Sequence, residues 1–293
     1  MRLNGTKRSN GSTQKSGTMK MKSLLTIVVV LALTVLSAAQ EGAKSALQGS
    51  MVDAVGLPGQ GWTAVGNPSP IEHNNFFTQS YFEQSAAVFS TYSGSITVTP
   101  FVGVGLVLDT KGYEWNNKIL PRMGVKVNKY FRKGVVSIGT AYSYEDRFKS
   151  FNSSGLIFYV QDWFGWQPVA DKSSRFPGSS WIEVGNLSPV ERGNILGLGY
   201  ISQGVVAKRF SRATLVPYVD ATVFRDSQGF DWDNRATVGG GVKAIIPGDQ
   251  IYTEVGMAYL HETRFDSGLS AGGLSVFTNF SFNWNLLGRK VGR

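Results

Sequence analysis

Two short segments of the sequence contain the residue types that are best suited to hold a ligand. Residues 109–117 and 226–234 each have an acid, a glycine, an aromatic residue, a second acid, a tryptophan and two Asn or Asp residues in the same order. Aromatic faces stack on sugar rings, and Asn and Asp side chains form hydrogen bonds with sugar hydroxyls. The candidate residues for binding a glycan are Trp115, Asn116, Asn117, Trp232, Asp233 and Asn234.

The same two segments have other interpretations. Their acidic oxygens could ligate calcium, but the spacing of an EF-hand loop is absent, so no metal site is expected. Alternatively, glycine and asparagine turn the chain, and tryptophan anchors a hairpin at a membrane interface. We favour this structural interpretation over ligand binding.

Charged residues also occur singly among small and polar residues on one side of several alternating segments. In a narrow channel such charges would select solutes. In a small barrel they would instead pair with one another and help to fill the interior. Both interpretations stay open. The charged residues expected in the lumen are Arg122, Lys126, Glu145, Asp220, Lys243, Glu254 and Glu262.

The sequence contains few residues that are spaced for catalysis. It has only His73 and His261 as histidines and no cysteine, and neither histidine has a nucleophile at a recognisable spacing. The glycines at 103–105 and 239–241 lie in strand-like segments and are weak as nucleotide-binding motifs. We therefore expect no catalytic residues, no cofactor and no enzymatic activity.

The elements that would carry these residues are β-strands, because apolar residues recur at every second position. Residues 96–108 carry mainly Ile, Val and Leu on one face and Thr, Gly and Phe on the other, and residues 274–284 alternate similarly. Small residues on the polar face suit the inside of a closed sheet. Segments of about 12–15 residues are long enough for a tilted bilayer crossing. An all-β fold, an antiparallel transmembrane β-barrel, is therefore expected.

The sequence also repeats itself. Residues 57–168, here module one, and residues 176–285, module two, contain the same motifs in the same order, including Pro-Gly, Gly-Asn and Ser-Pro pairs. Short and long connections alternate between the expected strands, as in bacterial barrels. Five long strands and one short strand near Trp62 or Trp181 in each module predict about 12 strands with both termini periplasmic. Ten strands are the alternative count.

Three residues conflict with a regular barrel. Pro100 and Pro217 fall in the middle of expected strands, where proline cannot donate a backbone hydrogen bond, so each requires a bulge nearby. Asp162 falls on the face expected to contact lipid, which requires a shift in register or a position at the periplasmic rim.

Composition and charge narrow the class further. The chain has 293 residues, 42% of them hydrophobic and 12% aromatic, no cysteine, and a net charge of +9. Six basic residues and no acid lie within residues 1–39, so the remainder has 23 basic and 20 acidic residues and a charge of only +3. This balance does not favour a nucleic-acid partner.

The basic N-terminus has the layout of a signal peptide. An apolar run at 24–36, too short for a membrane-spanning helix, is followed by the small residues 37–39, after which we expect cleavage. The basic region counted from Met1 is unusually long for a signal peptide, and a start at Met19 or Met21 would give a more ordinary one. Residues 40–56 are interpreted as an N-terminal periplasmic tether, and residues 57–293 as the barrel.

Together these features resemble a Gram-negative outer-membrane β-barrel protein. The resemblance rests on the leader, the alternating strands, and a closing segment with Phe282 and Trp284 that looks like the signal for the barrel assembly machinery. Nine residues follow Trp284, which departs from the usual pattern. The resemblance implies an outer-membrane location, with membrane lipid and the assembly machinery as partners.

The resemblance also implies a passive function. The expected role is a porin-like solute channel or a surface scaffold associated with glycans, with polysaccharide or small solutes as partners. The first alternative is a secreted, soluble β-sandwich that binds carbohydrate. The second is a barrel hydrolase that acts on lipid or peptide at the cell surface.

Overall fold

The computed structural model describes residues 57–86, 89–90, 95–248 and 250–286. The expected signal peptide and tether lie outside the described residues. No helix in the described part of the chain is long and apolar enough to cross a membrane. Two short 3-10 helices, η1 (Glu114–Asn116) and η2 (Asp231–Asp233), interrupt an otherwise all-β chain.

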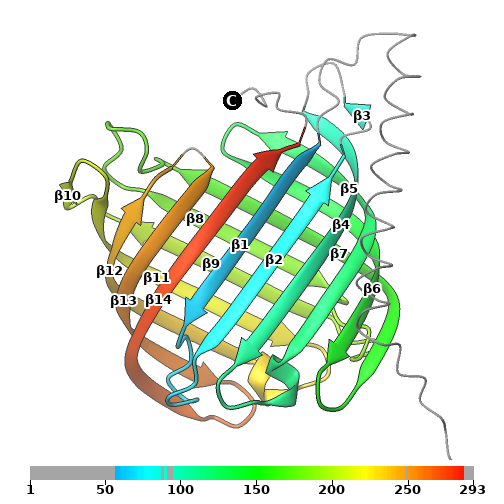
Figure 1. Ribbon diagram of the computed structural model, residues 1–293. Helices are drawn as coiled ribbons and strands as arrows, with labels where there is room; N and C mark the ends of the chain where they lie inside the picture. The colour runs from blue at the N-terminus through cyan, green and yellow to red at the C-terminus, as the bar shows by residue number, and fades with distance from the viewer. Residues whose placement is uncertain (1–56, 87–88, 91–94, 249, 287–293) are drawn as a thin grey trace, which may run out of the picture.

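Twelve strands of the described chain form one closed antiparallel sheet (Figure 1). They are β1 (Pro58–Gly66), β2 (Phe77–Ser85), β4 (Ile96–Asp109), β5 (Lys118–Phe131), β6 (Gly134–Arg147), β7 (Asn152–Trp166), β8 (Gly178–Gly185), β9 (Leu196–Gly204), β11 (Thr214–Asp226), β12 (Arg235–Ile246), β13 (Ile251–Arg264) and β14 (Ser270–Asn285). Two short pieces, β3 (Phe89–Ser90) and β10 (Lys208–Arg209), extend the sheet at one end.

The sheet closes because the first strand pairs with the last. β1 pairs with β2 on one side and with β14 on the other, with Trp62 opposite both Tyr81 and Ser281. Modules one and two meet at a second place in the wall, where β7 pairs with β8. The expected barrel of 12 strands is therefore confirmed, including the short strands β1 and β8. The alternatives of ten strands and of a two-sheet sandwich are wrong, because every strand finds a partner on each side within one sheet.

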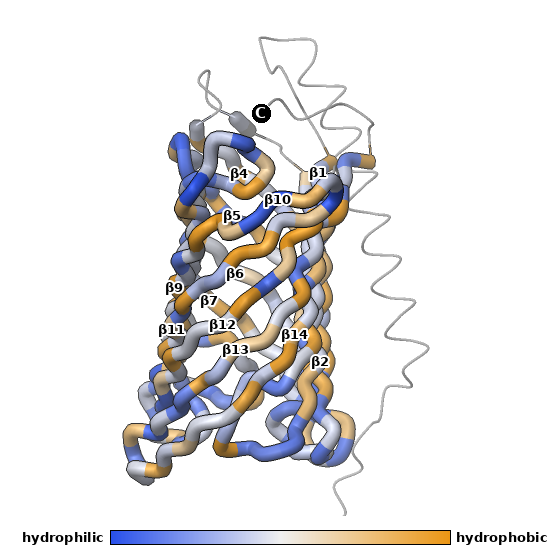
Figure 2. The backbone as a smooth tube through the Cα atoms, turned by 90° about the vertical axis from the view of Figure 1, so that its left-hand side faces the viewer, coloured by the Kyte–Doolittle hydropathy of each residue, from blue (hydrophilic) through white to orange (hydrophobic). Residues whose placement is uncertain are grey.

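The two faces of the wall differ as the alternating sequence predicts. Large apolar side chains on the outer face are exposed, for example Val219 at 62% and Leu274 at 63%, whereas their neighbours on the inner face are buried. Figure 2 shows hydrophobic and hydrophilic residues alternating along the strands of the wall. Soluble proteins rarely expose apolar area on this scale, so the outer wall is the surface of a membrane-spanning barrel.

A bulge accompanies each mid-strand proline. In module two, Gly204 lies opposite Tyr218 and Lys208 lies opposite Leu215, so four residue steps along β9 and β10 face three along β11. The Val205 N–H donates to the carbonyl of Pro217, and the Ala86 N–H donates to that of Pro100 in module one. The extra residue thus lies in the strand beside the proline, while the proline strand keeps its register with β12.

Asp162 lies on the outer face near one end of β7, without a shift in register. It is opposite Val136, which is close to the two-residue turn between β5 and β6. Its carboxylate accepts a hydrogen bond from the Ile182 N–H at 3.1 Å. This is the rim position that the sequence left open.

Candidate functional site

The two ends of the barrel have different connections. The end at the bottom of Figure 1, here the loop end, carries the β1–β2, β4–β5, β6–β7, β8–β9, β11–β12 and β13–β14 loops. The opposite turn end carries the two-residue β5–β6 turn and the linker of residues 167–177 between β7 and β8. The candidate ligand-binding residues all lie at the loop end.

The two tryptophan loops meet at the loop end and stack on each other. Trp115 and Trp232 have ring centroids 5.2 Å apart and planes inclined by 15°. Tyr113 stacks on Trp115 at 4.9 Å, and Phe230 stacks on Trp232 at 4.9 Å. Four nearly parallel rings, two from each module, therefore connect the β4–β5 loop with the β11–β12 loop.

The amide and acid side chains of these loops hold the turns themselves. Asp109 accepts hydrogen bonds from the Gly112 and Tyr113 N–H groups, at 2.5 and 3.1 Å, and from the Asn117 amide at 2.7 Å. Asn116 also donates to Asp109, at 3.0 Å. Gly112 has a φ of +69°, a conformation that favours glycine. Most of the polar side chains of this loop therefore form hydrogen bonds within the loop itself.

The second tryptophan loop is built in the same way. Asp226 accepts from the Gly229 and Phe230 N–H groups, at 2.7 and 3.1 Å, and from the Asn234 amide at 2.7 Å. Asp233 differs, because its counterpart is Asn116. Burial and the nearby carboxylate of Glu191 raise the pKa of Asp233 to about 6, although neighbouring cations oppose the shift.

A network of ion pairs joins the modules beneath the rings. Glu262 is fully buried and accepts a hydrogen bond from Ser69, while Glu145 is fully buried and accepts one from Ser188. In both cases a serine from the loop of one module meets a glutamate on a strand of the other.

Two arginines complete this network. Arg264 contacts Glu72 at 3.1 Å, and Arg147 contacts Glu191 at 2.5 Å. Arg264 also lies 3.6 Å from Asp231. Although burial opposes it, hydrogen bonds from Ser267 and the charge of Arg264 hold the pKa of Asp231 below its usual value. These serines, arginines and loop glutamates were not predicted as site residues, although all of them belong to the repeated motifs.

All seven charged residues expected in the lumen lie on the inner face. Lys126 pairs with Glu83 at 2.6 Å, and Lys243 pairs with Glu254 at 3.0 Å. Arg122 lies over the ring of Tyr81 at 4.2 Å. Asp220 is half-buried on β11. Glu83 was not predicted, although it occupies the inward position two residues after Tyr81.

Apolar side chains also point into the lumen and are shielded from water. Phe101, Ile157 and Tyr159 form one cluster and are 2%, 0% and 5% exposed. Val216 and Ile245 form a second cluster with Val169 of the turn-end linker. A wide water-filled channel would leave such inward side chains exposed, so the lumen is narrow at these levels.

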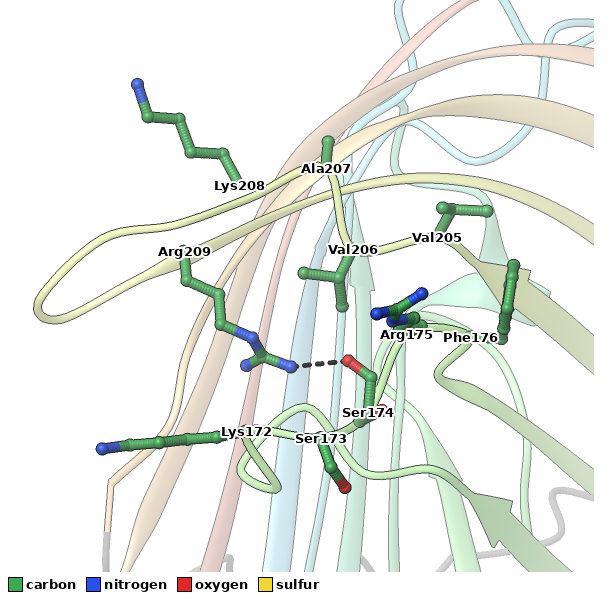
Figure 3. A pocket seen from close by; sticks show the side chains of 10 residues that line it. All are labelled: Lys172, Ser173, Ser174, Arg175, Phe176, Val205, Val206, Ala207, Lys208 and Arg209. Atoms are coloured by element: carbon green, nitrogen blue, oxygen red, sulfur yellow. Dashed lines mark hydrogen bonds between the residues drawn. The ribbon is translucent and has the colours of Figure 1, made fainter.

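A cleft with basic residues lies at the turn end (Figure 3). Arg209 donates to the carbonyls of Val169, Asp171 and Ser174, at 2.7, 3.0 and 2.7 Å, and so fastens the linker to β10. Lys172 and Lys208 extend away from the cleft. The arginine therefore has a structural role in joining the modules.

The architecture defines a class, a membrane-spanning β-barrel with a narrow polar lumen. No protein-family model matches the sequence, and no curated protein matches it either. Among solved structures, the chain is similar to an outer membrane channel from Pseudomonas putida F1, with a TM-score of 0.45 and 6% identity, covering 80% of this chain and 97% of that one.

Two autotransporter domains are also similar, with lower TM-scores. The β domain of BrkA from Bordetella has a TM-score of 0.36 and 13% identity, covering 78% of this chain and 99% of that one. The transport unit of AIDA-I from Escherichia coli has a TM-score of 0.37 and 10% identity, covering 84% and 97%. Likeness at this level carries no functional inference, and the class rests on the closed sheet and its apolar outer wall.

Proposed function

We propose that this chain is an exported, internally duplicated outer-membrane barrel that acts as a passive solute channel, with the stack of four aromatic rings lying across its loop end. The outer-membrane location is supported by the apolar outer wall, and export by the layout of residues 1–39. Membrane lipid and the barrel assembly machinery are its proposed partners, and the passage of solute needs no catalysis.

The ring stack is the observation that carries the channel function. The lumen beneath the stack is lined by paired charges and by buried Ser, Thr and Asn side chains. Such groups can form hydrogen bonds and ionic contacts with polar solutes. The stack that spans the loop end consists only of loop side chains from two modules, Trp115 and Trp232 at its centre. Such a contact can separate without breaking a strand of the barrel.

Planar-bilayer conductance tests this proposal. The full protein is first fractionated with membranes and compared on gels with and without heating, because a closed barrel migrates faster unheated. We expect low conductance for the wild-type protein and a higher conductance for Trp115→Ala/Trp232→Ala, because the stack is then removed. Phe158→Ala, which removes an aromatic side chain from the outer wall, is the control and leaves conductance unchanged. If the folded protein and both variants carry no current, the channel function is wrong.

A glycan-associated surface scaffold is the second candidate function. The aromatic and amide side chains at the loop end support it, but each indole already stacks on two rings of the protein. Sugar binding by Trp115 and Trp232 therefore requires the stack to open. Polysaccharide binding that is lost in Trp115→Ala/Trp232→Ala and kept in Phe158→Ala would support the scaffold, whereas binding unchanged in both variants would exclude these rings as its site.

A further inference from the structure

The outer wall brings together a nucleophile and a base that the sequence keeps apart. Ser270 begins β14 and His261 lies on β13, and the two strands are antiparallel neighbours. The hydroxyl oxygen of Ser270 lies 2.9 Å from Nε2 of His261. A serine within hydrogen-bond distance of an imidazole is the arrangement that activates a hydroxyl for attack on a carbonyl.

The surroundings of this pair are apolar and face outward. Both side chains are exposed, and Tyr259, Leu269 and Leu274 nearby are exposed apolar residues of the same region. Glu262, although adjacent to His261 in sequence, points into the lumen and binds Ser69, so it is not part of this pair. The pair therefore lies on the lipid side of the wall, close to the loop end.

We propose that Ser270 and His261 form an acyl-transfer site for carboxylic esters of long-chain fatty acids. The Ser270 oxygen attacks the ester carbonyl carbon, and its proton passes to Nε2 of His261. The ester C–O bond then breaks, and the same proton passes to the departing alcohol. Water next attacks the acyl-serine, His261 accepts a proton from it, and this proton returns to Ser270 as the fatty acid leaves.

This reaction requires one particular tautomer of the His261 imidazole. Nε2 must accept the serine proton, so the ring hydrogen lies on Nδ1. The Ser270 hydroxyl also lies 3.2 Å from the carbonyl of Glu262 and 3.3 Å from Thr263 Oγ1. These contacts hold the nucleophile at the start of β14, beside the imidazole ring.

Module one provides a matched comparison on the same wall. There Ser154 is exposed on the outer face near the loop end, but its hydroxyl lies 2.7 Å from the phenol oxygen of Tyr142. A phenol is a far weaker base than an imidazole. Ser154 is therefore the control for a serine with a similar position and no base.

Covalent labelling with a long-alkyl fluorophosphonate, followed by mass spectrometry, tests the proposal on the full protein in detergent. We expect labelling of Ser270 in the wild-type barrel, none in Ser270→Ala, and a labelling rate about 100-fold lower in His261→Asn. Ser154→Ala is labelled at the wild-type rate. Trp115→Ala/Trp232→Ala is also labelled normally, because the site lies outside the lumen and does not depend on the proposed channel.

Two results would overturn the site. One is the absence of labelling in wild-type protein that shows the heat-dependent gel shift of a folded barrel. The other is labelling of Ser270→Ala at the wild-type rate. An unchanged rate in His261→Asn would equally remove the histidine from the reaction.

Discussion

Modules one and two make equivalent contacts at the loop end but different contacts in the middle of the lumen. At the loop end the same contacts occur twice, as in Ser69 with Glu262 and Ser188 with Glu145. In the lumen the two lysines have carboxylates from different strands, Glu83 on β2 for Lys126 and Glu254 on β13 for Lys243. The loop-end contacts run between modules, whereas both lysine pairs lie within one module.

This difference has a physical explanation. At the loop end, each module supplies the serine of one contact and the glutamate of the other. Each copy must therefore keep both residue types. A pair within one module can be satisfied in any way that neutralises the buried charge. A further example is a pair of opposite residues in which one is large and the other small. In module one the large residue, Arg122, lies on the first strand of the pair and faces Ser143. In module two the large residue, Leu260, lies on the second strand and faces Gly239.

The largest effect is expected from a lumen glutamate that has no counterpart. Glu83→Ala leaves the buried Lys126 without a partner and should lower the free energy of unfolding by about 3–5 kcal/mol. Ser202→Ala, at the corresponding position of module two, removes only a neutral hydrogen bond to Tyr200 and should cost about 1 kcal/mol. Urea unfolding in phospholipid vesicles measures both. Equal losses in the two variants would contradict the asymmetry of the lumen.

At the loop end the two halves should respond alike. Glu145→Ala and Glu262→Ala each remove a buried acceptor of a serine and an arginine, and each should lose about 2–3 kcal/mol in the same unfolding experiment. The two losses should add in the double variant, because the sites share no partner. A loss in only one of the two variants would show that the loop-end contacts are not equivalent.

Asp233 breaks the symmetry of the loop end and provides a pH test. Its pKa of about 6 is higher than that of an unfolded aspartate, so the folded state binds its proton more tightly. The protonated Asp233 therefore contributes on the order of 2 kcal/mol to the free energy of unfolding at low pH. This contribution is lost as the pH rises from about 4 to about 6. Asp233→Asn, which introduces the residue of module one, should remove this decline. A decline of the same size in the variant would exclude Asp233 as its source.

The smallest effect is expected from the contact between the two indoles. A double-mutant cycle with Trp115→Ala and Trp232→Ala isolates their coupling, which should be about 0.5–1.5 kcal/mol for a stacked pair. Chemical unfolding of the four proteins measures it. The same cycle between Trp115 and Phe282 on a distant strand serves as the control and should show no coupling.

Much of the fold could be predicted from the sequence, because a barrel wall has a period of two. The outward position of Leu274 and the inward positions of Lys126 and Lys243 follow from alternation alone. The bulges near Pro100 and Pro217 follow from the missing N–H of proline. The candidate site was predicted less well: the tryptophan loops were found, but the stacking of Trp115 on Trp232 was not.

The sequence by itself thus determined where the strands lie and which faces they have, since these depend on residue spacing along single strands, and it favoured 12 strands over ten. Only the tertiary structure decided the closure of the sheet, the final strand count and which side chains meet. Trp115 meets Trp232, Ser69 meets Glu262 and Ser270 meets His261 because closure and strand register place their positions together. Periodicity specifies the face on which a side chain lies, whereas contacts between distant strands depend on how the whole sheet closes.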